Sequence, residues 1–435
     1  MRRFPYLVVV AIVLGVVVGL VGTLFHLAAD GLLSIHRAVA GSQPPGIRIA
    51  ISATAASVMT VLGVAVVRRI APEASGSGVP EVEGAMADEL PLRWKRILPV
   101  KFVSGVLAIG AGLVVGREGP TIHIGAAISQ AFASVLKISQ IERRGLIAAG
   151  AAAGLSAAFN APVASVMFVL EETRRQFPHT ADTYASVIVA SLGSALVTQA
   201  ILGSGRLVEL SMRDDITGVI LLAVILGVFL GGVGVTFNRL LVWALDRMAR
   251  LTEEWVYGFS ALFGAVAGAL LVVDPNFVQG GEALVTTMTD SPAPGLALLI
   301  TLVLGRFRVT IASYSVGIAG GIFAPILCLG TALGVMTAVL VNALPLGLEV
   351  DPAVCAVIAM TGLFSATVGA PMVAVIILME LTAGYVYLPE LMACSIAAAL
   401  SARALGGRPI YEVLFERRLE REAGTPVKRE PQPEP

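Results

Sequence analysis

One acidic residue, Glu118, lies in a glycine-rich segment between two stretches that read as membrane. The segment is Gly116-Arg117-Glu118-Gly119-Pro120, and apolar or small residues cover 102–115 before it and 124–135 after it. A carboxylate at bilayer depth costs at least about 2.5–3.5 kcal/mol unless it meets water or a partner, so it is a functional-site candidate. Glycine and proline break the helix here, and non-helical backbone at membrane depth is tolerated only inside protein or along a cavity. The segment therefore predicts an ion pathway.

Two further glycine-rich segments offer hydrogen-bond donors. In Gly76-Ser77-Gly78-Val79-Pro80-Glu81 the proline and the following acids predict a helix start. Ser77 would then present its hydroxyl, beside backbone N–H groups, at the positive end of a helix, where anions bind. A similar anion site is predicted, without a charged side chain, at the helix break in Gly321-Ile322-Phe323-Ala324-Pro325, where backbone N–H groups are free to bind an anion. A solvated turn is the alternative for the first segment, and an ordinary glycine–proline kink is the alternative for the second.

Two neighbouring acids and one tyrosine stand close to the ends of apolar runs. Glu171 and Glu172 precede Arg174-Arg175, so either acid could simply pair with these arginines at the membrane surface. Because neighbours on a helix point about 100° apart, at most one of the two acids should face a pore. Tyr385 has a donor hydroxyl that could reach an anion, although tyrosines near span ends are more often interfacial anchors.

No pattern of side chains predicts a metal site, a cofactor or an enzyme. The four histidines are scattered, and His123, which follows the Glu118 segment, is expected to pack or to be satisfied locally. HExxH spacing and a Ser/His/Asp arrangement on a plausible elbow are both absent from the sequence. The three cysteines lie in apolar runs without CxxC spacing and read as buried, inert thiols.

The composition places the whole chain in a membrane. Of 435 residues, 56% are hydrophobic and only 14% are charged, against roughly 25% charged in an average soluble domain. Lipid is therefore an expected partner. The 30 basic and 30 acidic side chains leave no net charge, so nothing indicates nucleic acid as a partner.

Hydropathy divides the chain into full spans and shorter apolar stretches. Runs long enough to cross a bilayer lie near 6–26, 48–67, 97–115, 184–203, 216–245 and 353–379. Short or interrupted stretches, which predict tilted or re-entrant helices, lie at 124–137, 146–170, 258–273, 293–304, 315–341 and 391–405.

The distribution of basic residues predicts the orientation. Arginine and lysine cluster at the start of the chain, at 93–96, at 174–175 and from 408 onward. Short basic loops stay in the cytoplasm, so both termini are expected there. The charged, proline-containing segment 413–435 is expected to be a disordered cytoplasmic tail.

The sequence repeats itself. Residues 148–173 overlay on 357–382, and the 116–127 segment overlays on 321–332 at nearly the same offset. Two halves, near 30–203 and 216–405, follow, and paired interrupted helices in two halves indicate a substrate site at the middle of a transporter. The acids Glu118 and Glu172 overlay on apolar residues of the second half, which a mere packing repeat would not explain.

These segments occur in the order and approximate spacing of the CLC family of chloride channels and proton-coupled chloride transporters, which the chain resembles over about residues 5–412. The resemblance implies an all-α polytopic fold of two inverted-topology halves with tilted and re-entrant helices, a membrane transport domain over 1–412, and a homodimer. It also implies a multi-pass protein of the bacterial inner (plasma) membrane. Because the resemblance is to prokaryotic members of the family, no regulatory nucleotide-binding (CBS) domains are expected after the membrane part.

The resemblance assigns anion-binding roles residue by residue. Ser77 and Tyr385 would bind the central chloride through their hydroxyls. Gly78 belongs to the same turn, and backbone N–H groups of Ile322 and Phe323 would complete the site.

The resemblance also implies voltage- or pH-sensitive chloride transport, with chloride and protons as the ions moved. Glu118 would be the external gating and proton-transfer glutamate, and Glu172 the internal one. Arg117 and Lys101 would be supporting residues of the site. Chloride/proton antiport is the favoured activity because Glu172 matches a glutamate found in most exchangers and replaced in channels; a passive chloride channel is the alternative.

Overall fold

The computed structural model describes residues 3–41, 43–136, 138–203, 217–290, 293–345, 349–382 and 384–423, which fold into α-helices with short connections. Eight of the described helices are long and apolar enough to cross a membrane. These are α1 (Arg3–Gly41), α2 (Pro45–Ile70), α8 (Ala181–Leu202), α9 (Thr217–Ala249), α10 (Glu253–Val273), α12 (Leu296–Ser315), α13 (Phe323–Asn342) and α16 (Leu388–Ala404), the last counted together with the turn from Tyr385 that precedes it.

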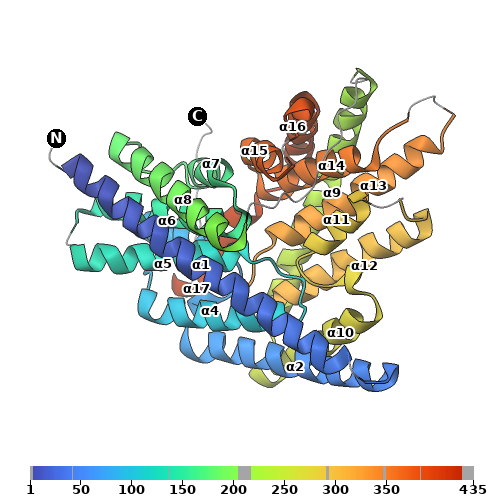
Figure 1. The fold of residues 1–435 in the computed structure, drawn as a ribbon, viewed down its shortest axis with the longest axis horizontal. Helices are drawn as coiled ribbons and strands as arrows, with labels where there is room; N and C mark the ends of the chain where they lie inside the picture. Colours follow the sequence, from blue (N-terminus) through green and yellow to red (C-terminus); the bar gives the residue numbers. More distant parts are fainter. Residues whose placement is uncertain are drawn as a thin grey trace.

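The remaining helices are shorter, kinked or interrupted. They are α3 (Val79–Met86), α4 (Trp94–Gly110), α5 (Glu118–Leu136), α6 (Gln140–Phe159), α7 (Pro162–Glu172), α11 (Glu282–Asp290), α14 (Pro352–Val368), α15 (Pro371–Thr382) and α17 (Ile410–Ala423). Three single turns of 3₁₀-helix complete the set: η1 (Pro72–Ala74), η2 (Pro275–Phe277) and η3 (Tyr385–Tyr387). In Figure 1, α1 to α8 gather on one side, most of the later helices occupy the other, and α17 returns to the first half.

The predicted span 353–379 is two helices, α14 and α15. Gly369 ends α14 in the left-handed conformation with φ 81°, and its N–H donates to the carbonyl oxygen of Ser365 at 2.9 Å. Pro371 then starts α15, because a proline without an N–H suits a first helical turn. The stretches near 258–273, 293–304 and 391–405 were predicted as short or interrupted but lie in full-length helices.

The two halves make matching hydrogen bonds. Ser156 Oγ, in α6, donates to the carbonyl oxygen of Ser191 in α8 at 2.9 Å. Ser365 Oγ, in α14, donates to the carbonyl oxygen of Ser395 in α16, also at 2.9 Å. Helices α5 to α8 therefore recur as α13 to α16.

A reciprocal pair of carboxylates shows that the repeat is inverted. Glu171, at the end of α7, accepts hydrogen bonds from the N–H groups of Met372 (3.3 Å) and Val373 (2.8 Å), at the start of α15. Glu380, near the end of α15, accepts hydrogen bonds from N–H groups at the start of α7 (3.1 and 2.8 Å). Each helix end meets the other helix's beginning, so α7 and α15 run antiparallel.

The tail prediction is wrong for the residues up to Ala423, which are helical in α17. Apolar Ile410, Tyr411 and Phe415 share one face of this helix and are 0–3% exposed. That face packs against α3 and α14, so the apolar stripe compensates for the surrounding charges. Residues 424–435 of the predicted tail lie outside the described residues.

Candidate anion and proton site

The three glycine-rich segments converge at the centre of the molecule. Gly116 and Gly321 exchange two backbone hydrogen bonds of 2.8 Å each. Gly76 donates its N–H to the carbonyl oxygen of Ile318 at 3.0 Å, so the first segment lies against the same loop. A Cβ atom on Gly119 would lie 2.8 Å from the Cα atoms of both Ser77 and Gly321. Only glycine allows three backbones to approach this closely.

Glu118 lies at the positive end of a helix. Its carboxylate Oε1 accepts hydrogen bonds from the N–H groups of Phe323 (2.8 Å) and Ala324 (3.3 Å), at the start of α13. The Glu118 side chain is fully buried. Unpaired N–H groups at a helix start favour anions. The Glu118 carboxylate thus occupies a position at the start of α13 that is suited to binding an anion.

Two buried side chains hold the turn that carries Ser77. Lys101 Nζ donates to the carbonyl oxygens of Ala74 (3.1 Å) and Gly76 (2.6 Å). The N–H of Ser77 donates to the hydroxyl oxygen of Tyr314 at 3.2 Å. The Ser77 hydroxyl in turn accepts from the N–H of Val79 at 3.4 Å, at the start of α3. Lys101 and Tyr314 therefore both contact the backbone of the Ser77 turn, and the sequence does not predict the contact of Tyr314.

Gly78 meets His123 in the core. Gly78 has φ 87°, and a Cβ atom there would lie 2.4 Å from Nδ1 of His123. His123 is fully buried, and neither ring nitrogen bonds to the described part of the chain. Of the two roles expected from the sequence, packing and local hydrogen bonding, the described part of the chain shows packing against the Ser77 turn.

Aromatic side chains surround Phe323 behind its N–H group. Its ring centroid lies 4.6 Å from that of Phe364, 5.3 Å from Phe168 and 6.1 Å from Tyr411. Tyr411 is fully buried, and its hydroxyl has no hydrogen-bond partner among the described residues. A buried donor without a partner in the described chain, on a ring beside that of Phe323, is a candidate anion ligand.

Tyr385 does not reach this site, so its assignment as an anion ligand is wrong. It lies in η3, between α15 and α16, and is 64% exposed. The pattern that would have identified Tyr411 is Arg408-Pro409-Ile410-Tyr411, a proline at a helix start followed by an amphipathic helix. The charges of this segment led to its interpretation as a tail.

Glu172 lines a cavity of about 310 Å³ that also contains Glu83, Arg174 and Glu412. Its neighbour Glu171 also borders this cavity, but the Glu171 carboxylate is occupied by the two N–H groups of α15. The two adjacent acids thus differ in their bonding, as their helical spacing predicts. A second, smaller cavity of about 80 Å³ leads to Ser77 and is lined by Tyr314, Arg417 and Arg418.

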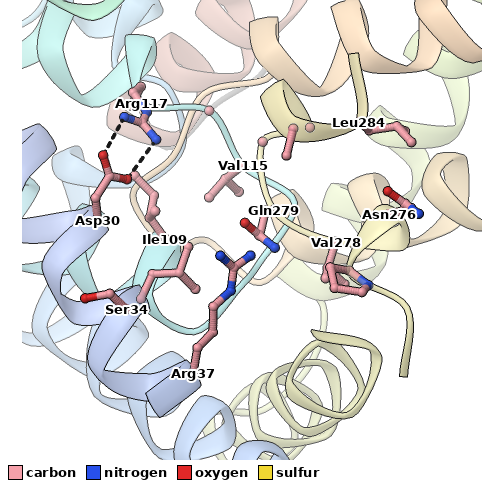
Figure 2. Close-up of a pocket in the computed structure, with 16 residues that line it drawn as sticks. Asp30, Ser34, Arg37, Ile109, Val115, Arg117, Asn276, Val278, Gln279 and Leu284 are labelled. Atoms are coloured by element: carbon pink, nitrogen blue, oxygen red, sulfur yellow. Dashed lines mark hydrogen bonds and ion pairs between the residues drawn. The ribbon is translucent and has the colours of Figure 1, made fainter. Parts of the chain in front are cut away.

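A larger cavity of about 470 Å³ lies next to the segment that precedes Glu118 (Figure 2). Arg117 lines it and forms an ion pair with Asp30 at 3.0 Å, and Figure 2 shows both side chains at its edge. Arg117 Nη1 also lies 3.3 Å from Nδ1 of His26. Arg117 is therefore held beside Glu118 by α1, a contact that its sequence position alone does not reveal.

The cavities of Glu172 and Arg117 lie on opposite sides of the membrane part. Helices α1 and α8 run parallel, because Gly15 adjoins Ala190 and Thr23 Oγ1 lies 3.3 Å from Thr198 Oγ1. Residues 174–175 precede α8 and so lie at the level where α1 begins. Asp30 is more than twenty residues further along α1, or roughly 30 Å along a helix axis.

Comparisons with known proteins agree with this geometry. A model of the voltage gated chloride channel family matches residues 58–403. The H(+)/Cl(−) exchange transporter ClcA of Vibrio parahaemolyticus is 36% identical over 96% of this chain and 90% of its own length. That of Vibrio cholerae is 36% identical over 94% of this chain and 89% of its own.

Solved structures show the same fold. A slow cyanobacterial Cl−/H+ antiporter superposes with a TM-score of 0.91 at 34% identity, covering 96% of this chain and 99% of the other. A eukaryotic CLC transporter superposes with a TM-score of 0.82 at 23% identity, over 94% of this chain and 73% of the other, which supports the fold alone. With its family match over most of its length and its two inverted halves, the chain belongs to the voltage gated chloride channel (CLC) family.

Proposed function

We propose that this protein is a secondary active transporter that exchanges chloride for protons across a membrane. The observation that carries the proposal is the Glu118 carboxylate, bound by the Phe323 and Ala324 N–H groups at the start of α13. A titratable group in an anion site couples the two ions, because protonation removes its charge and frees the donors for chloride. Relatives named as H(+)/Cl(−) exchange transporters support the same activity.

The anion pathway follows from the donors around Glu118. Ser77 and Gly78 supply the turn at the start of α3, and Ile322 and Phe323 supply N–H groups at the start of α13. Tyr411 takes the role first assigned to Tyr385, because its ring lies beside that of Phe323 and its buried hydroxyl has no partner in the described chain. Such a site offers donors and no net acidic charge once Glu118 is protonated, which favours anions over cations.

The proton pathway needs titratable groups on both sides of the site. Glu118 serves the outer side, and Glu172, in the cavity on the opposite side, serves the inner side. Arg117 fixes the backbone before Glu118 through Asp30, and Lys101 fixes the Ser77 turn. The two pathways would coincide at Glu118 and then diverge, with protons passing to Glu172 and chloride passing to Ser77.

A liposome experiment tests exchange against the channel alternative. Purified protein is reconstituted with a chloride gradient, and chloride efflux and proton movement are recorded together with a chloride electrode and a pH electrode. Exchange drives protons opposite to chloride and against their own gradient, whereas a channel moves chloride alone. Glu118→Gln should retain chloride movement and lose the proton movement. Chloride efflux by the wild-type protein without proton movement would replace the antiport assignment by the channel.

The orientation of the protein follows from its basic loops. The start of α1, residues 174–175 and α17 lie on the Glu172 side, and short basic segments remain in the cytoplasm. Both termini are therefore proposed to be cytoplasmic, with the Arg117 cavity facing outward, in the inner membrane of a bacterium.

A homodimer is the proposed assembly. Helix α8 exposes Ile188, Leu192 and Leu196 on one face, and α16 exposes Ile396 and Leu400 on another, all 48–61% exposed. Helices α7 and α15 pack against each other between them, so the four helices form one continuous layer. Because both halves contribute exposed apolar side chains to this layer, a second copy of the chain related by two-fold symmetry could pack against it.

A further inference from the structure

A second guanidinium group, that of Arg37, points into the outer cavity. Arg37 lies near the end of α1, about two helical turns beyond Asp30. Figure 2 shows its side chain directed inward, toward the side chain of Gln279. The same cavity is bordered by Gly116 and Arg117, immediately before Glu118. Arg37 therefore faces the space that an ion from outside must cross to reach Glu118.

The charges of this cavity do not cancel within the described lining. Arg117 and Asp30 form an ion pair with two hydrogen bonds, at 3.0 and 3.3 Å, so their charges offset each other. Arg37 forms neither a hydrogen bond nor an ion pair with the part of the chain that the structure describes. Among the charged side chains described in the lining, Arg37 thus leaves one positive charge at the mouth.

The wall opposite Arg37 is held rigidly and carries amide groups. The loop 275–281 contributes the side chains of Asn276 and Gln279 to the lining. Arg306, fully buried, donates to the carbonyl oxygens of Asn276 (2.6 Å), Val278 (3.0 Å) and Gln279 (2.9 Å). Gln279 itself has φ 64°, an unusual value for a residue other than glycine. Backbone held in such a conformation is common where a side chain must be placed for function.

We propose that Arg37, with the amide of Gln279 opposite, forms an anion-capture site for chloride and other small monovalent anions at the outer mouth of the pathway. The inference rests on the proposed chloride transport and adds a residue that governs how external chloride arrives. A cleft with one sign of charge and low-dielectric walls raises the local concentration of the opposite ion. Arg37 acts before Glu118 and takes no part in proton transfer, so it affects capture and leaves the exchange ratio unchanged.

The sign of the charge at position 37 is the quantity to vary. In Arg37→Cys, membrane-impermeant thiol reagents that carry a positive, a neutral or a negative group are added to one side of the liposomes. Cys328, Cys355 and Cys394 are buried, so the new thiol is the one accessible to reagent within the described chain. Adding reagent outside also selects the molecules whose Arg37 side faces outward. Chloride uptake is then measured at chloride concentrations below saturation, at ionic strengths of about 10 mM and about 300 mM set with an impermeant salt.

The expected order of uptake rates is positive above neutral above negative, with about 3- to 10-fold between the extremes at low ionic strength. At high ionic strength the difference should fall below about 2-fold, because a Debye length of several ångströms screens the cavity. Val39→Cys, on the same helix but outside the cavity lining, should show no dependence on reagent charge. The ratio of chloride to protons should stay constant throughout.

Equal rates with all three reagents, or equal inhibition by all three, would overturn the capture site and leave chloride/proton exchange intact. Wild-type protein that moves no chloride in the same liposomes would instead refute the proposed function. Arg37→Lys supplies the remaining check, since it retains the charge and should keep uptake within about 2-fold of wild type.

Discussion

At the scale of single residues, adjacent acids at the end of α7 have different bonding. Glu171 caps the start of α15 through two hydrogen bonds, whereas Glu172 borders the cavity of about 310 Å³ beside Glu83 and Glu412. A capping carboxylate stabilises a helix start, and a carboxylate in a cavity can exchange protons with water. Helical spacing predicts only that the two side chains diverge, and the family resemblance alone singled out Glu172 for proton transfer.

Glu172→Gln should abolish proton movement while chloride still passes, because the amide keeps size and hydrogen bonding but carries no transferable proton. Glu171→Gln should keep proton movement and lower stability by about 1 kcal/mol, since it removes the charge from a helix cap. Parallel chloride and pH recordings in liposomes measure the first effect, and thermal unfolding in detergent measures the second. Equal loss of proton movement in both variants would contradict this division of roles.

Two tyrosines offer a second matched comparison. Tyr411→Phe removes a buried hydroxyl without a partner in the described chain, so chloride affinity should fall about 10- to 100-fold, the contribution of one hydrogen bond to an anion. Tyr385→Phe alters an exposed side chain and should change affinity by less than about 2-fold. Isothermal titration with chloride measures both. An unchanged affinity in Tyr411→Phe would exclude its hydroxyl from the anion site.

The replacement of Tyr385 by Tyr411 as the candidate anion ligand shows which residues could not be identified from the sequence. Glu118, Ser77 and Phe323 sit in glycine- and proline-rich breaks, which are visible in a sequence because breaks are costly inside a membrane. Tyr411 enters the site from an amphipathic helix whose charges resemble those of a tail. Its position depends on α17 folding back against α3, a long-range contact that no local pattern encodes.

At the scale of elements, helix ends carry most of the chemistry. Helices α3, α5 and α13 all begin near one point, so their N–H groups can serve one anion. Length and hydropathy identified several of the spanning helices but merged α14 with α15, because both are apolar and a single Gly-Ala-Pro break separates them. The repeat offered the missing signal, since Ala161-Pro162 breaks the first half at the corresponding place.

A cluster at the start of α6 gives a pH prediction. Asp88, in the connection after α3, receives hydrogen bonds from Gln140 at 2.7 Å and from Arg143 and Arg144. Partial burial acts to raise the pKa of its carboxyl, but these bonds outweigh burial and hold the pKa below its ordinary value of 3.8. The stabilisation is therefore complete above about pH 4 and is lost as the pH falls through the lower, folded-state pKa.

Asp88→Asn should lower the melting temperature by about 1–2 °C at pH 7, and the difference from wild type should shrink below about pH 4. The three buried cysteines permit the measurement, because a thiol-reactive dye reports their exposure on unfolding. Asp182→Asn, at a half-buried position in the first turn of α8, is the control. A difference that persists unchanged at pH 3 would show that Asp88 does not act through its charge.

At the scale of the whole molecule, the exposed apolar layer formed by α7, α8, α15 and α16 predicts the assembly. Leu192→Trp together with Leu400→Trp should yield a monomer, because a bulky apolar side chain is tolerated by lipid but not by a packed partner surface. Size-exclusion chromatography with light scattering in detergent measures the mass. Leu221→Trp, exposed on α9 outside this layer, should leave the dimer intact. A dimer that survives the double substitution would place the interface elsewhere.

The reciprocal carboxylates of α7 and α15 also bear on how the chain is made. The first N–H groups of α7 find their partner in Glu380, 217 residues further along the chain. During synthesis the first N–H groups of α7 therefore lack this hydrogen-bond acceptor until nearly all of the second half has been inserted into the membrane. Neither half is a finished unit by itself, and an ancestor with only one half would have needed a second copy, inverted in the same membrane, to complete it.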